Sequence, residues 1–151
     1  MPLNIVLIEP EIPNNTGNIG RLALASGSKL HLVKPFGFEL TDKKLKRAGL
    51  DYWKHISVSI YENQEEFFKM HGHKEMVFFS SHGKKTHWEI EYSENLFLIF
   101  GKESVGLPKS LLSAKNTVVA KIPLKASQIR SLNLANAVAI AVYEGLRQLS
   151  I

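Results

Sequence analysis

The segment NIVLIEPEIPNNTGNIGRLALASG, Asn4 to Gly27, decides the fold, because an apolar run passes through one turn directly into a run of small residues. Its first five residues are typical of a buried strand, and the prolines, asparagines and glycines that follow are typical of a tight connection. We expect a helix to begin near Thr16, with Asn14, Asn15 or Thr16 as its cap. The segment therefore predicts a strand followed by a helix.

The rest of the chain repeats this alternation. Short apolar, β-branched or aromatic runs predict strands, and the segments between most of them predict helices, one of them capped by Asn63. The predicted strands are 4–9, 29–34, 56–61, 75–81, 95–101 and 116–122, and the predicted intervening helices include 41–49, 63–70 and 108–114. The pattern indicates an α/β fold with a mostly parallel sheet and flanking helices, in a single domain spanning residues 1–151.

Composition narrows the class of protein. Lysine and arginine number 19 against 14 aspartates and glutamates, a net charge of +5 that favours a polyanionic partner without requiring one. There is no cysteine, so disulfides, thiolate metal ligands and cysteine nucleophiles are excluded. No apolar run reaches the roughly 18 residues of a membrane span, and the first residues lack a secretory signal. We therefore expect a cytoplasmic protein with no membrane partner.

The segment from Ser131 to Ser150 predicts a final helix that is apolar around most of its circumference. Such a helix needs cover on two sides, and the sheet of a small domain covers only one. We therefore expect a homodimer through the C-terminal helix, with its interface around Ala137, Ala141 and Tyr143.

Two nucleotide-binding motifs are absent from the strand-end loops, where ligands of α/β sheets bind. A phosphate-binding loop ending at Gly101 and Lys102 would need glycine at Leu96 and serine or threonine at Glu103. The first turn offers only Gly17 and Gly20, short of a dinucleotide fingerprint. The histidines at 71 and 73 have zinc-like spacing, but no third ligand with fixed local geometry accompanies them, so no metal is expected.

Arg21 has two interpretations from the residues alone. A guanidinium about one turn inside the first helix could join the helix-start amides in binding a phosphate or carboxylate, with Gly17 and Gly20 allowing another backbone to approach. It could equally be a solvated arginine beside a capped structural turn. Both interpretations stay open at this point.

Three blocks of sequence together resemble one family. They are EPEIPNNTGNIGRLALASG (9–27), FLIFGKESVGLP (97–108) and IPLKASQIRSLNLANAVAIAVYE (122–144). In this order, and over essentially the whole chain, they resemble the SPOUT superfamily of knotted RNA methyltransferases, and within it the small TrmL branch of tRNA (cytidine/uridine-34)-2′-O-methyltransferases. The phrase RAGLDYW (47–53) is similar to the same branch.

The resemblance implies a function, a cofactor and site residues. It implies transfer of a methyl group from S-adenosylmethionine to the ribose of nucleotide 34 in the anticodon stem-loop of tRNA, with leucine isoacceptors as the expected substrates, and a C-terminal deep trefoil knot that binds the cofactor. The implied cofactor residues are Phe79, Gly101, Ile122, Ser131 and Leu132. The implied catalytic residues are Arg21, Asn15, Glu103 and Asn133.

Three alternatives remain beside this interpretation. One is methylation of another tRNA or ribosomal RNA position, a second is a catalytically silent RNA-binding knot protein, and a third is a flavodoxin-like module. Within the main interpretation, the resemblance makes Arg21 the catalytic arginine. A guanidinium keeps its proton at neutral pH and is a poor base. We therefore expect Arg21 to hold a phosphate and polarise the hydroxyl, while an RNA phosphate oxygen or water takes the proton.

Overall fold

Parallel strands form the centre of the molecule in the computed structural model, which describes residues 2–41, 43, 45, 47 and 52–150. The strands are β1 (Leu3–Ile8), β2 (Lys29–Val33), β3 (Val58–Tyr61), β4 (Met76–Phe79), β5 (Lys85–Thr86), β6 (Leu96–Phe100) and β7 (Val118–Lys121). They form one sheet in the order β3-β2-β1-β6-β4-β7-β5, and every recorded pair is parallel. The predicted mostly parallel α/β fold is therefore confirmed.

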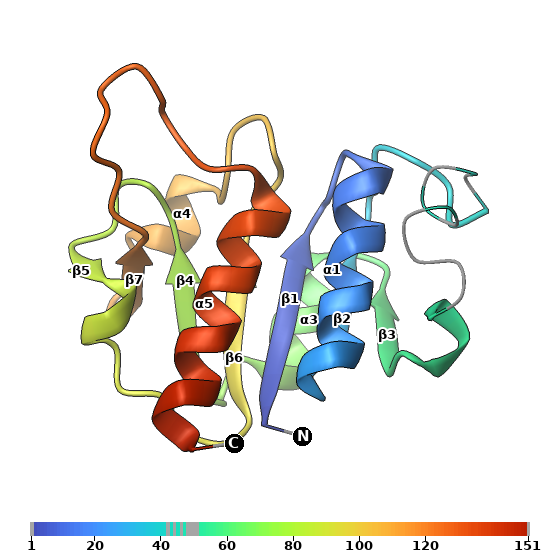
Figure 1. Ribbon diagram of the computed structural model, residues 1–151, viewed down its shortest axis with the longest axis horizontal. Helices are drawn as coiled ribbons and strands as arrows, with labels where there is room; N and C mark the ends of the chain where they lie inside the picture. The colour runs from blue at the N-terminus through green and yellow to red at the C-terminus, as the bar shows by residue number, and fades with distance from the viewer. Residues whose placement is uncertain (1, 42, 44, 46, 48–51, 151) are drawn as a thin grey trace.

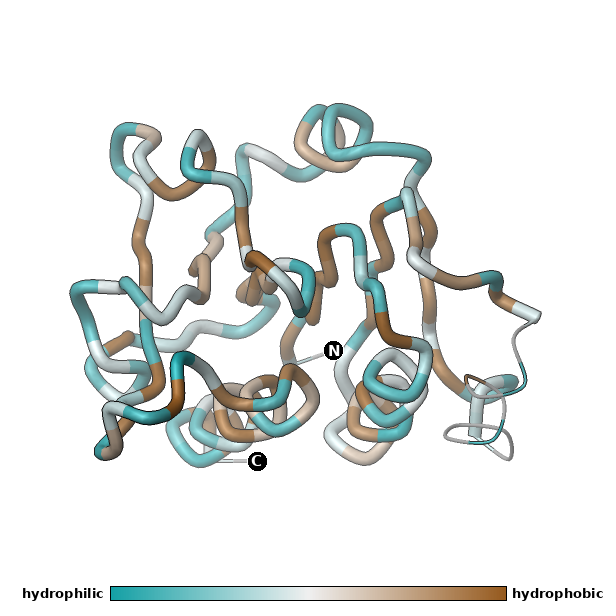
Figure 2. Tube along the Cα trace, turned by 90° about the horizontal axis from the view of Figure 1, so that it is seen from above, coloured by the Kyte–Doolittle hydropathy of each residue, from teal (hydrophilic) through white to brown (hydrophobic). Residues whose placement is uncertain are grey.

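Helices cover both faces of this sheet. They are α1 (Pro13–Ser26), α3 (Gln64–His71), α4 (Lys109–Leu112) and α5 (Leu134–Leu149), with 3₁₀ turns η1 (Trp53–His55) and η2 (His87–Glu89). Helices α1 and α5 pack beside each other on one face, and α3 lies behind the sheet (Figure 1). Figure 2 shows the apolar strands between these two helical layers.

The alternation of side chains along β1 explains why the sheet needs two layers. Leu3, Ile5 and Leu7 point into the larger core cluster, whereas Val6 and Ile8 point into the second cluster, around Phe67. All six residues of β1 are buried. A strand buried on both faces carries no polar alternation, which is the pattern of a central parallel strand.

The expected elements and the observed ones differ clearly at two places. Strand β5 is absent from the prediction, because two residues give no recognisable apolar run. Helix α1 begins at Pro13 rather than near Thr16, so the predicted caps lie inside the helix. The expected helix at 41–49 lies partly outside the described residues. The Asn63 cap is confirmed, since its side chain accepts a hydrogen bond from Glu66 N.

A chain of buried polar side chains crosses the second core cluster. Asn4 Nδ2 donates to Asn95 O, so its Oδ1 accepts from His31 Nε2 at 2.8 Å. His31 Nδ1 is then the acceptor for the Tyr61 hydroxyl at 2.8 Å, and that hydroxyl oxygen accepts from His71 Nε2 at 2.9 Å. Each of these contacts is satisfied with both imidazoles neutral, and a proton added to His31 Nδ1 would remove the acceptor of the Tyr61 hydroxyl.

The buried histidine predicts an acid-sensitive stability. Burial, with smaller contributions from Lys29, His71 and Lys74, lowers the pKa of His31 to about 3, against about 6.5 in an unfolded chain. The unfolded chain therefore binds this proton more readily, and the free energy of unfolding falls as pH drops from about 6.5 towards 3, by up to about 1.4 kcal/mol per pH unit. In urea denaturation between about pH 6.5 and about pH 5, the free energy of unfolding of His31→Gln should fall less steeply with decreasing pH than that of the wild type. Equal slopes would contradict the assignment.

Candidate active site

Loops from distant parts of the sequence meet where the parallel strands end. Segments 9–12, 80–84, 101–107 and 122–133 follow the carboxyl ends of β1, β4, β6 and β7, along the upper edge of the sheet in Figure 1. Ser80 N donates to Ala120 O at 2.9 Å, which brings the loop after β4 against the end of β7. This edge is therefore the candidate site.

The start of α1 is completed by a residue from another loop. Its N-cap, Ile12, makes no side-chain cap, and the first turn of α1 contains no acidic residue. Instead the Glu103 carboxylate accepts hydrogen bonds from Glu11 N and Ile12 N, each at 2.8 Å. Backbone amides at a helix start favour an anion, and Glu103 supplies it. Glu103 therefore occupies the amides of the two residues that precede the first residue of α1, Pro13.

Three of the four implied catalytic residues form one hydrogen-bonded unit. Glu103 Oε2 accepts from Asn15 Nδ2 at 3.2 Å, and Asn15 Oδ1 accepts from Asn133 Nδ2 at 3.0 Å. Asn133 is also the N-cap of α5, where its side chain accepts from Asn136 N. The starts of α1 and α5 are thus joined to the loop after β6.

Arg21 lies on α1 two turns beyond Pro13, further into the helix than expected. Its exposed guanidinium lies over the Tyr52 ring, 4.9 Å from Cζ to the ring centroid. A methyl group on Gly20 would come within 2.8 Å of Trp53 Cζ3, so Gly20 admits the Trp53 ring rather than a second backbone. Tyr52 thus lies against the arginine and Trp53 packs on the helix beside it, and both are part of the RAGLDYW phrase that resembles the family.

The residues implied for cofactor binding lie in the loops at this edge. Phe79 is 8% exposed and its ring stacks on Phe100, with centroids 4.7 Å apart, so its backbone is the part available to a ligand. A Cβ on Gly101 would collide with the backbone of Gly106 and Leu107, because the loop folds back through a bridge between Lys102 and Gly106. Only glycine fits at position 101.

The segment after β7 offers backbone groups for binding. Ile122 and Leu132 are partly buried, and Ser131 is exposed. No backbone–backbone hydrogen bond is recorded between residues 122–132 and any other described residue. Backbone amides and carbonyls without such a partner are available to hydrogen-bond a polar ligand. This arrangement fits the cofactor binding, largely through backbone, that the family resemblance implies.

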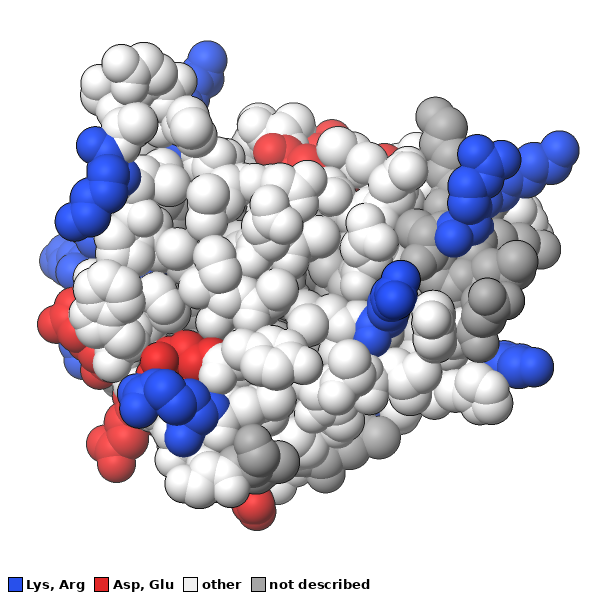
Figure 3. Space-filling model, viewed as in Figure 1, with Lys and Arg blue, Asp and Glu red and all other residues white. Residues whose placement is uncertain are grey.

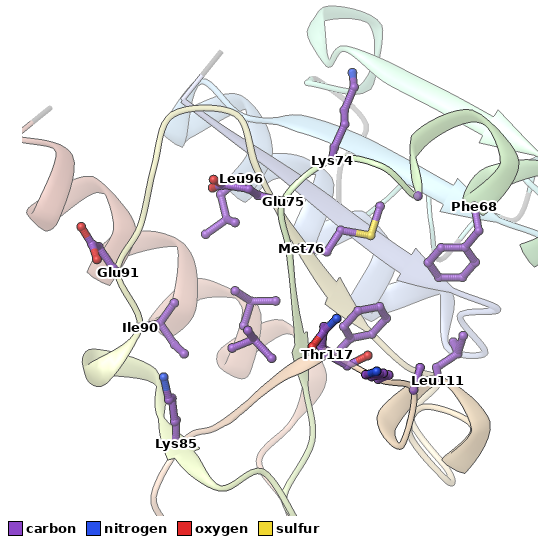
Figure 4. Close-up of a pocket in the computed structure, with 17 residues that line it drawn as sticks. Phe68, Lys74, Glu75, Met76, Lys85, Ile90, Glu91, Leu96, Leu111 and Thr117 are labelled. Carbon is purple, nitrogen blue, oxygen red and sulfur yellow. The ribbon is translucent and has the colours of Figure 1, made fainter.

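His71 and one described pocket lie away from this unit. His71 belongs to the buried chain with Tyr61, and no three His, Asp or Glu side chains of the described residues gather as a metal site. A pocket of about 680 Å³ lies at the opposite, amino ends of the strands, lined by residues such as Met76, Leu96 and Thr117 (Figure 4). It contains none of the implied site residues. No described helix has the length and apolar character to cross a membrane.

Comparison with known proteins defines the class. The model of the SpoU rRNA Methylase family matches residues 2–143. A relative from Saccharophagus degradans, a tRNA (cytidine(34)-2'-O)-methyltransferase, is 46% identical over 97% of this chain and 95% of its own length. The chain belongs to the SpoU rRNA methylase family, which confirms the resemblance read from the three sequence blocks.

Solved structures agree with this assignment. One, from work on the 2-OH methylation of C/U34 on tRNA, has a TM-score of 0.92 and 44% identity, covering 98% of this chain and 96% of that one. The AdoMet-bound rRNA methyltransferase from Sinorhizobium meliloti has a TM-score of 0.86 and 27% identity, covering 97% of this chain and 56% of that one. AdoMet is S-adenosylmethionine.

Proposed function

We propose that this protein transfers a methyl group from S-adenosylmethionine to the 2′-hydroxyl of the ribose of nucleotide 34 in tRNA, with leucine isoacceptors as substrates. The observation that carries the proposal is the hydrogen-bonded unit of Asn15, Glu103 and Asn133, which come from three separate segments of the sequence. Asn15 lies on α1, the helix that also carries Arg21. The activities of the similar proteins support the same reaction and position.

Residues at the strand ends bind the donor in this proposal. Backbone groups of Phe79, Gly101, Ile122, Ser131 and Leu132 hold it, beside the Phe79–Phe100 pair. S-adenosylmethionine supplies an electrophilic methyl group on a sulfonium. The tight turn at Gly101 keeps the binding loop in one conformation, which lowers the entropic cost of binding.

Arg21, Asn15 and Asn133 act on the acceptor side. In-line transfer requires the ribose hydroxyl to be held against the donor and to lose its proton. The Arg21 guanidinium binds the neighbouring phosphate and polarises the hydroxyl. Its position over the Tyr52 ring already restricts its conformations, so it loses less conformational entropy when it binds the substrate. The proton passes to an RNA phosphate oxygen or to water. Glu103 accepts from three donors of the chain itself and therefore holds the site together rather than reacting.

The same proposal covers the architecture and location of the enzyme. We propose one catalytic domain over residues 1–151, with the segment after β7 threaded as a deep trefoil knot, as in the SPOUT superfamily. In support, the loop 80–84 touches β7 closely, since a Cβ on Gly83 would lie 2.5 Å from Ala120 C. A tRNA substrate places the reaction in the cytoplasm.

The enzyme acts as a homodimer through the α1 and α5 face. Charged side chains are sparse over these two helices (Figure 3), while Ile12, Ile140 and Tyr143 are 44%, 39% and 50% exposed. Exposed apolar residues on a face with few charges favour self-association. The interface expected from the sequence needs one correction. Ala141 is fully buried within the protomer, and its carbonyl accepts from the Tyr92 hydroxyl, so Ile140 takes its place beside the expected Tyr143.

A charged substitution tests the dimer. Ile140→Asp should yield a monomer in sedimentation velocity, because an unpaired carboxylate would otherwise be buried in the interface. Ile60→Asp is the matched control, since Ile60 is 43% exposed but lies on the edge strand β3. A dimeric Ile140→Asp, or a monomeric Ile60→Asp, would place the interface elsewhere.

Mapping the methylated nucleotide tests the reaction itself. The purified protein is incubated with S-adenosylmethionine and total RNA from a strain that lacks this gene, and nuclease fragments are weighed by mass spectrometry. One added methyl on the ribose of nucleotide 34 is expected. A methyl at another tRNA position or on ribosomal RNA would reassign the substrate. No methyl on any RNA would favour the silent RNA-binding alternative.

A further inference from the structure

The loops 9–12 and 101–107 exchange hydrogen bonds in both directions. While Glu103 accepts from the amides of Glu11 and Ile12, the Glu11 carboxylate accepts from Ser104 N at 2.8 Å. Each loop therefore offers one carboxylate to the backbone of the other. We call this pair of contacts the reciprocal latch.

Glu11 is held in its ionised form at this position. The Ser104 backbone amide is the main cause that keeps the pKa of the Glu11 carboxyl below its usual range, with a smaller contribution from Lys102. Lys102 Nζ itself lies 3.1 Å from Glu9 Oε1, a third contact between the same two loops. Gly37 closes the other side of the loop, where a Cβ would lie 2.7 Å from Glu11 O. The loop at Glu11 is thus confined between two neighbours.

The latch connects the two halves of the site through stiff elements. On one side, Gly106 N donates to Lys102 O at 2.9 Å and closes the turn that contains Ser104. A movement of Ser104 therefore also moves Gly101, which precedes this turn. On the other side, Glu11 lies two residues before the first residue of α1, the helix that carries Arg21. A shift of Ser104 relative to Glu11 therefore changes the spacing between the donor loop and the arginine.

We infer that Glu11 is a positioning residue, whose carboxylate oxygen fixes the donor loop 101–107 against the acceptor helix α1 through the amide of Ser104. This inference rests on the proposed methyl transfer but assigns a residue that the reaction itself does not touch. Transfer rates depend steeply on alignment, and misplacement by about 1 Å costs on the order of 100-fold.

Two substitutions separate the effect of side-chain length at Glu11 from the effect of its charge. Glu11→Gln keeps an acceptor oxygen at the same distance without the charge, whereas Glu11→Asp keeps the charge but withdraws it by one methylene. We expect kcat on saturating tRNA to stay within about threefold of wild type for Gln and to fall at least about tenfold for Asp, with the Kd for S-adenosylmethionine nearly unchanged in both. Glu62→Asp, at an exposed glutamate, is the control and should leave kcat unchanged.

A second readout does not need activity. Hydrogen exchange of the Ser104 amide, followed by NMR on the protein without RNA, should accelerate in Glu11→Asp and stay near wild type in Glu11→Gln. Equal kcat in both variants, or a larger loss for Gln than for Asp, overturns the inference. Unchanged exchange of Ser104 in Glu11→Asp also overturns it. A wild-type protein that methylates no RNA refutes the proposed function instead, while the exchange experiment still decides whether the latch exists.

Discussion

Arg21→Ala should reduce methyl transfer to tRNA by roughly 100-fold or more, because loss of one preorganised charged donor at a reacting group typically costs 10²- to 10³-fold. The guanidinium is exposed, and no hydrogen bond is recorded between it and any other described residue, so its loss should leave folding intact. Single-turnover rates with saturating tRNA, together with the Kd for S-adenosylmethionine and the sedimentation coefficient, measure the effect. We expect only the rate to change.

Matched variants make this result specific. Lys69→Ala removes one exposed positive charge from α3, on the opposite face of the sheet, and should leave the rate unchanged. Arg21→Lys keeps the charge but loses the planar pair of donors, so its rate should lie between wild type and Arg21→Ala. Normal turnover in Arg21→Ala would remove Arg21 from the mechanism, and a loss in Lys69→Ala equal to that in Arg21→Ala would point to general electrostatic attraction instead.

Gly101→Ala should abolish tight donor binding. Its Cβ would occupy the same space as the backbone of Gly106 and Leu107, and backbone cannot swing aside as a side chain can. Opening the turn moves the donor loop and strains β6, at a cost of roughly 1–3 kcal/mol. Titration calorimetry should show at least about a tenfold weaker Kd for S-adenosylmethionine, and the Tm should fall by roughly 2–10 °C.

Gly106→Ala is the control within the same loop. Position 106 has open space around its Cα, but its φ of 72° is left-handed, so alanine there costs only about 1–2 kcal/mol of backbone strain. We expect a lower Tm with a smaller change in Kd than for Gly101→Ala. If Gly101→Ala binds the donor as tightly as wild type, position 101 does not shape the donor site.

The sequence predicts the sheet well because the signal is local. Each inner strand contains enough apolar residues to be predicted from its own sequence, and β1 is buried on both faces. Strand β5 escapes prediction because Lys85 and Thr86 form an edge contact with β7 alone. The polar chain through His31, Tyr61 and His71 also escapes, since its members lie on three separate elements and nothing in their spacing links them.

The site is predictable as a set of residues but not as an arrangement. Asn15, Glu103 and Asn133 follow from family resemblance, whereas their mutual hydrogen bonds depend on the tertiary fold. The start of α1 at Pro13, rather than near Thr16, has the same cause. Sequence patterns place the capping side chain next to the helix, whereas the acceptor for the amides of Glu11 and Ile12 is the distant Glu103. Glu11, which has no motif of its own, becomes visible only through its contact with Ser104.

The distant origin of Glu103 has a consequence for synthesis on the ribosome. Glu11 and Glu103 are separated by 92 positions, and the amides of Glu11 and Ile12, which lead into the first helix, lack this acceptor until that later segment has emerged. Contacts of such long range form late and slow the folding rate. The nascent N-terminal strand and helix therefore remain weakly ordered during translation, and the methyl-transfer site is assembled only when nearly the whole polypeptide is available.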